Sequence, residues 1–141
     1  MSPDTTTHGG PMHASHRSIA VAALSAALVV TGAPLAFAKG GDTVIRTGSC
    51  SGSADWKLKA AHDNGRVEVE YEVDSNHVGQ TWRVRIRDNG VLVTKTRATT
   101  GGRSGSFEVS RSIANRAGSD NLVARAYDLG SGQTCVGRLS I

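Results

Sequence analysis

The run VEVEYEVDSNHVGQTWRVRIR, residues 67–87, alternates apolar and charged side chains along most of its length. Its charged positions are Glu68, Glu70, Glu72 and Asp74 in the first half and Arg83, Arg85 and Arg87 in the second. Alternation with a period of two is typical of a β-strand with one buried face and one wet face. The run therefore predicts two strands whose charges lie in water. Acid–base catalysis needs a partly buried acid of raised pKa, so we do not expect it here.

The same alternation continues through the rest of the chain. Further strands are expected at residues 43–47, 55–61, 91–96, 107–109, 122–127 and 134–141. Asp88-Asn89-Gly90 predicts a hairpin turn, because Asn and Gly accept positive φ at little cost. The stretch SRSIANRA, residues 110–117, favours one or two helical turns, since Ser110 stands at its start as a cap and Gly118 follows where a C-cap would lie. About eight short strands in about a hundred residues predict a β-sandwich.

The segments VEVEYEVDSN, GQTWRVRIRDNG, SGSFEVSRSI and NLVARAYD, in this order, resemble strands B, C, C′, E, F and G of an immunoglobulin-like or fibronectin-III-like domain. Trp82 sits where that family has its strand C tryptophan. The resemblance implies an all-β, immunoglobulin-like antiparallel β-sandwich of about seven or eight strands, here with one short helical turn. The whole chain also resembles small exported proteins of unknown function from high-GC Gram-positive bacteria, which implies a compartment but no activity.

Two arrangements of residues 67–73 and 82–88 follow from the alternation. As a direct hairpin, each glutamate would face an arginine and each apolar residue another apolar residue. As strands B and C of a sandwich, the two segments would lie in different sheets, and the domain would have one basic face. The fold resemblance favours the second arrangement. The basic residues concerned are Arg83, Arg85 and Arg87, joined by Arg125 and Arg138.

Residues 1–38 have the pattern of a secretory signal peptide. A short basic stretch at His16-Arg17 precedes an apolar run from Ile19 to Leu35, and the small residues before Lys39 suit a signal peptidase. We expect cleavage after Ala38, which leaves residues 39–141 as a single secreted domain without a stable membrane anchor.

Both the cleavage of the predicted signal peptide and its first residue have alternatives. Residues 19–38 are just long enough to span a bilayer as an uncleaved anchor. Translation could start at Met1 or at Met12, and Met12 gives a leader of more ordinary length.

The chain has two cysteines, Cys50 and Cys135. In an exported protein, two cysteines predict one disulfide bond. The spelling Gly48-Ser49-Cys50-Ser51-Gly52 matches a nucleophile elbow, but no helix pattern follows it as that motif requires. Zinc-binding spacing is absent as well. We therefore expect no catalytic cysteine, no metal site and no cofactor.

The sequence favours a non-enzymatic binding module of the cell envelope or the extracellular space. Its arginine face would contact an anionic cell-wall polymer or an acidic protein. We expect no nucleic acid partner. Trp82 alternates in step with Val84 and Ile86, which places it on the buried face, and no exposed aromatic residues are interleaved with the arginines. An alternative is a small secreted inhibitor that presents the loop Asp74–Gln80 or Thr99–Ser106 to an extracellular enzyme. A third hypothesis is an enzyme built on His62 or His77, both of which we expect in loops.

Overall fold

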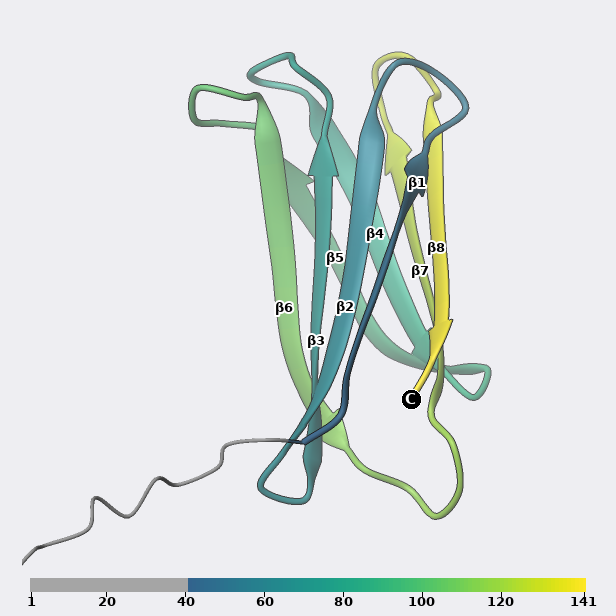
Figure 1. Cartoon of the computed structure of the whole chain (residues 1–141). Helices are drawn as coiled ribbons and strands as arrows, with labels where there is room; N and C mark the ends of the chain where they lie inside the picture. The colour runs from purple at the N-terminus through teal and green to yellow at the C-terminus, as the bar shows by residue number, and fades with distance from the viewer. Residues whose placement is uncertain (1–40) are drawn as a thin grey trace, which may run out of the picture. The chain divides into compact units, whose positions relative to one another are not determined.

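Eight strands form two antiparallel four-stranded sheets in the computed structural model, which describes residues 41–141 (Figure 1). They are β1 (Thr43–Ser49), β2 (Asp55–Asp63), β3 (Arg66–Asp74), β4 (Thr81–Asp88), β5 (Val91–Thr99), β6 (Ser106–Ala114), β7 (Asn121–Asp128) and β8 (Thr134–Ser140). The predicted all-β sandwich is confirmed. The predicted signal peptide, with its cleavage after Ala38, lies outside the described residues. Those residues include no helix that is long and apolar enough to cross a membrane.

The two halves of the alternating run lie in different sheets. The first sheet has the strand order β1-β2-β3-β6 and the second β5-β4-β7-β8. β3 therefore pairs with β2 and β6, whereas β4 pairs with β5 and β7. This confirms the crossover and excludes the direct hairpin. With β3 as strand B and β4 as strand C, strands C′, C, F and G share one sheet and B and E the other, as in immunoglobulin-like domains.

The core lies between the two sheets and is built from the inward half of each alternation. Its buried side chains include Leu58, Val67, Val69, Tyr71, Val73, Trp82, Val84, Ile86, Phe107, Val109, Ile113, Leu122 and Leu139. Trp82 on β4 is fully buried, and its ring centroid lies 6.0 Å from that of Phe107 on β6 of the opposite sheet. The predicted core position of Trp82 is therefore correct.

The predicted helical turn over residues 110–117 is wrong, because β6 continues as a strand to Ala114. β6 pairs with β3 along its whole length, which buries Val109 and Ile113 in the core. Arg111 stands opposite Val69 yet is exposed, since β6 is an edge strand. A charge at an inward position is a common protection of sheet edges against further pairing. Arg111 also breaks the alternation of apolar and polar residues along this segment, and its sequence therefore resembles that of a helix.

Two hairpins turn through Asn-Gly pairs. Asn89 and Gly90 have φ of 45° and 84°, and Asn64 and Gly65 have φ of 50° and 75°. Two successive positive φ angles are the signature of a type I′ turn, which matches the twist of the flanking strands. The first turn was predicted from the sequence. The second carries the same dipeptide signal, and the sequence interpretation missed it.

The edge between β1 and β8 is closed by covalent and steric contacts. Cys50, directly after β1, forms the predicted disulfide with Cys135 of β8. Beside it the Trp56 ring lies against two glycines, and a Cβ on Gly48 or Gly137 would come within 2.6 or 3.0 Å of that ring. The ring thus fills the space between the two edge strands. A disulfide is consistent with an extracellular location.

Candidate functional site

Seven cationic side chains lie on the outward face of the second sheet. This basic face consists of Arg83, Arg85 and Arg87 on β4, Lys95 and Arg97 on β5, Arg125 on β7 and Arg138 on β8, all exposed. The structure therefore brings together all five arginines that the sequence suggested. It adds Lys95 and Arg97, which the sequence interpretation missed, although their alternation within residues 91–99 carries the same signal.

Like charges face one another across the strands of this sheet. Arg83 lies directly opposite Arg97, on the neighbouring strand. On the next rung of the same face, Arg85 has Lys95 on one side and Arg125 on the other. Directly opposed like charges destabilise a sheet. Folding alone gives no reason for three such pairs on adjacent rungs.

No carboxylate on the second sheet neutralises the basic face. The acidic residues of its strands are Asp88 and Asp128, and their side chains are only 1% and 2% exposed on the core side. None of the seven cations forms an ion pair within residues 41–141. Arg87 donates to the carbonyl oxygen of Gly90 at 2.8 Å, and the Arg83 guanidinium lies 5.9 Å from the centre of the exposed Tyr127 ring. Most of the donors on the face are free to bind a ligand.

The outward face of the first sheet is different, because its two lysines are paired with carboxylates and further carboxylates are left over. The Lys59 ammonium lies 3.1 Å from the Glu70 carboxylate, and Lys57 forms an ion pair with Glu72. The hydrogen bond to Glu72 raises the pKa of Lys57. Glu70 and Glu72 of β3 therefore have counter-charges on β2, although Glu72 also faces Glu108 of β6, and the arginines of β4 have no counter-charge in their sheet. The predicted dipolar character of the domain is present.

Two hollows mark the basic face. The β4–β5 hollow, of about 410 Å³, is lined by Arg83, Arg85, Lys95, Thr96 and Arg97. The β4–β7 hollow, of about 260 Å³, is lined by Arg83, Arg85, Arg125, Ala126, Tyr127 and Thr134. Arg83 and Arg85 line both hollows. The cations are thus grouped around surface depressions that a ligand could occupy.

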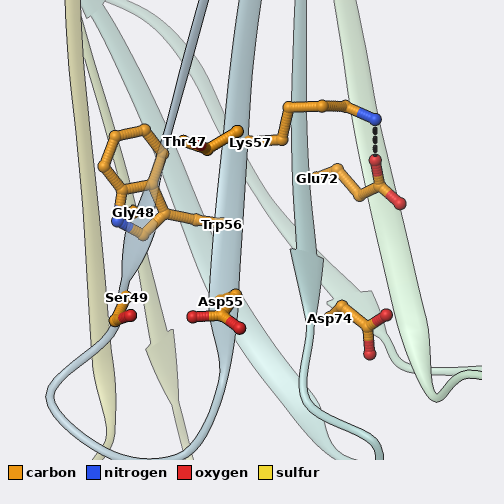
Figure 2. Close-up of a pocket in the computed structure, with 8 residues that line it drawn as sticks. All are labelled: Thr47, Gly48, Ser49, Asp55, Trp56, Lys57, Glu72 and Asp74. Atoms are coloured by element: carbon orange, nitrogen blue, oxygen red, sulfur yellow. Dashed lines mark ion pairs between the residues drawn. The ribbon is translucent and has the colours of Figure 1, made fainter.

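A further hollow, of about 440 Å³, lies on the first sheet around Trp56 (Figure 2). Figure 2 shows the Lys57 ammonium directed at Glu72, with the carboxylates of Asp55 and Asp74 apart from that pair. Asp74 accepts a hydrogen bond from the backbone N–H of Asn76 at 3.1 Å. The hollow is thus lined by groups of both charges, and several of them already form ion pairs or hydrogen bonds within the protein. Residues 41–141 contain no group of three His, Cys, Asp or Glu side chains that could hold a metal ion.

The two histidines of the domain lie at opposite ends of the sandwich. His62 belongs to β2, where a loop was expected, and its Nδ1 is 3.4 Å from the Asn115 side-chain nitrogen near the β2–β3 hairpin. His77 lies in the loop after β3, where its carbonyl oxygen accepts a hydrogen bond from the Thr100 hydroxyl. They share no site.

Buried aspartates end β4 and β7 in contrasting environments. Asp128 accepts hydrogen bonds from the N–H groups of Gly130 and Ser131, each at 3.1 Å. Asp88 lies beside the fully buried Asp120, neither of whose carboxylate oxygens has a donor among the described residues. Burial, and then the charge of Asp120, raises the pKa of Asp88 above its usual range, against the opposing effect of Arg116. Burial alone would raise the pKa of Asp128, but hydrogen bonds from the Ser131 hydroxyl and from the Gly130 and Ser131 N–H groups outweigh it, so that this pKa is lowered.

Asp88→Asn is expected to raise the free energy of unfolding at pH 7 by about 1–2 kcal/mol, because the amide can donate to Asp120. A raised pKa means that the folded state holds the proton more tightly. The stability contributed by Asp88 is therefore present below the unfolded pKa, near 4, and is lost as the pH rises through the folded pKa. Urea unfolding at pH 4 and pH 7 should show a smaller decrease in the free energy of unfolding for the variant than for the wild type.

Asp128→Asn is the matched control, since this carboxylate accepts hydrogen bonds that an amide satisfies less well. We expect it to lower stability at pH 7. A loss of stability in Asp88→Asn at pH 7 would contradict the assignment of Asp88 as a destabilising carboxylate.

No protein-family model matches the chain, and no curated protein matches it with significant similarity. Function must therefore be argued from the charge, exposure and register of the described residues. The basic face is the feature in which these three properties coincide.

Proposed function

We propose that the protein is an exported, non-enzymatic binding module that contacts an anionic polymer of the cell envelope through the basic face. The observation that carries this proposal is the set of like-charge pairs on adjacent rungs, Arg83 with Arg97 and Arg85 with both Lys95 and Arg125. A bound polyanion would relieve the repulsion between these cations. Without such a partner, the repulsion only destabilises the sheet.

A repeating polymer fits the face better than a compact ligand. The seven cations extend over all four strands of the sheet instead of converging on one enclosed cavity. Along β4, arginines recur every second residue, which is about 7 Å in an extended strand. Charges repeated at this spacing match a partner whose own charges repeat, which favours a wall polymer over an acidic protein. The disulfide and the predicted leader are both in keeping with export.

Binding should depend strongly on salt, because exposed charges are screened. We expect the full-length protein to co-sediment with purified Gram-positive cell wall at about 0.05 M salt and to be released at about 0.5 M. Arg83→Gln/Arg85→Gln/Arg125→Gln removes the centre of the basic face and should weaken binding at least about tenfold. Failure of the wild type to bind at low salt would contradict the wall proposal.

A second triple variant controls for net charge. Arg46→Gln/Arg103→Gln/Arg111→Gln removes the same number of arginines from β1, the β5–β6 loop and β6, all outside the basic face. Its binding should stay within about twofold of the wild type, since the excess charge of the face is intact. Equal losses in the two variants would show that total charge, and not this face, controls binding.

Secreted inhibition remains the second candidate, and one observation favours it. The two predicted inhibitor loops are hydrogen-bonded to each other through Gly79 N–H to Thr100 O at 2.8 Å and Thr100 N–H to Gln80 O at 2.9 Å. The first of these loops carries Val78, whose side chain is 68% exposed. An absence of wall binding would make stoichiometric inhibition of extracellular proteases the next assay, with Val78→Asp as the variant.

A further inference from the structure

We infer that the β4–β5 hollow is the site for a tetrahedral oxyanion, a phosphate or sulfate group of the polymer, and that the rest of the basic face attracts the polymer less specifically. This inference rests on the proposed function. It goes further by naming the residues that select the anion and the chemical class that they select.

Of the two hollows on the face, the β4–β5 hollow is lined by more cations. Its lining consists of Arg83, Arg85, Lys95 and Arg97 with the neutral Thr96. These four cations form two complete like-charge pairs on adjacent rungs, Arg83 opposite Arg97 and Arg85 opposite Lys95. The β4–β7 hollow has three cations, and one of its rungs pairs Arg83 with the neutral Tyr127.

The paired cations are confined to these two rungs, because Lys95 and Arg97 are the only cations of β5. The β4–β5 ladder shifts between Ile86 and Arg87, and Arg87 lies opposite the apolar Leu92. Bulges of this kind re-aim side chains and end regular pairing. β5 is also an edge strand, so no further strand covers that side of the hollow. The site is therefore limited in length and open to a chain that enters from the sheet edge.

The arrangement of donors favours a tetrahedral group over a carboxylate. A carboxylate has two oxygens in one plane, and a single guanidinium satisfies them in a bidentate pair. The donors of this hollow come from two strands and two rungs, and so approach from several directions. A sulfate ester or a phosphomonoester offers three terminal acceptor oxygens, and a phosphodiester offers two besides its bridging oxygens, all arranged tetrahedrally instead of in one plane. Such an anion can accept from both pairs at once.

The test compares three polymers of matched charge at one low ionic strength. These are inorganic polyphosphate, dextran sulfate and poly-L-glutamate, titrated against the full-length wild-type protein by fluorescence anisotropy or calorimetry. We expect polyphosphate, dextran sulfate or both to bind at least about fivefold more tightly than polyglutamate, and the tighter of the two identifies the source of the oxyanion. Equal affinity for polyglutamate would overturn the inference and leave a general polyanion-binding function intact.

Two double variants separate the hollow from the remaining face. Lys95→Gln/Arg97→Gln should abolish the preference over polyglutamate, so that the affinity ratio falls to about one. Arg125→Gln/Arg138→Gln removes the same charge from β7 and β8, and should weaken all polymers alike while the ratio is retained. Loss of the preference in both variants would overturn the assignment to this hollow. Absence of binding to every polymer at low salt would overturn both this inference and the proposed function.

Discussion

Cys50→Ala/Cys135→Ala is expected to lower the free energy of unfolding by about 4–5 kcal/mol and the Tm by roughly 20 °C. The two cysteines are 85 residues apart, so the disulfide closes a loop that includes most of the described domain. The entropy that a cross-link removes from the unfolded chain grows with the length of this loop. The total free energy of unfolding of domains of this size is only about 5–15 kcal/mol. Urea unfolding with linear extrapolation measures the difference.

Reduction of the wild-type protein provides the control for this experiment. Cys135 is fully buried and Cys50 packs against the core, so the alanine variant also loses sulfur contacts. Reduced wild type keeps both side chains and should be destabilised by nearly the same amount, because the cross-link is the dominant effect. Equal stability of the oxidised and reduced proteins would contradict the expectation. The large predicted effect also suits a protein that works outside reducing compartments.

The alternation of residues 67–87 was sufficient to predict β3 and β4 and to place Trp82 in the core. It could not decide whether the two strands pair with each other, because both arrangements keep the same faces buried. The fold resemblance favoured the crossover, and the strand orders agree with it. β6 was mistaken in part for a helical turn because Arg111 interrupts the pattern. Whether an inward position is covered depends on the neighbouring strand, and β6 has a neighbour on one side only.

The candidate site, like the fold, was predicted only as far as the pattern within single strands allows. Residues two apart on one strand share a face, so Arg83, Arg85 and Arg87 could be grouped from the sequence. Their opposition to Lys95 and Arg97 depends on the register of β4 with β5 and on the shift beside Arg87. A shift of one residue reverses every side chain beyond it. The like-charge pairs that carry the functional argument therefore required the structure.

Trp82→Ala is expected to lower the free energy of unfolding by about 3–5 kcal/mol, because it removes the largest fully buried side chain of the core. The Trp82 ring contacts Phe107 across the two sheets, so the cavity would form at their interface. Sheets that lose such a contact cannot close the gap without moving many paired strands. Chemical unfolding of this variant beside the wild type measures the loss.

Trp82→Phe distinguishes the volume of the side chain from its polar atom. The indole Nε1 is buried and has no hydrogen-bond partner among residues 41–141, so its removal should cost nothing in hydrogen bonding. The smaller ring keeps an aromatic contact with Phe107, and we expect a loss of only about 1–2 kcal/mol. A loss as large as that of Trp82→Ala would show that the indole N–H has a partner that holds the strand in place. A clear difference between the two variants would assign the role of Trp82 to packing between the sheets, which keeps the second sheet, and with it the basic face, in register.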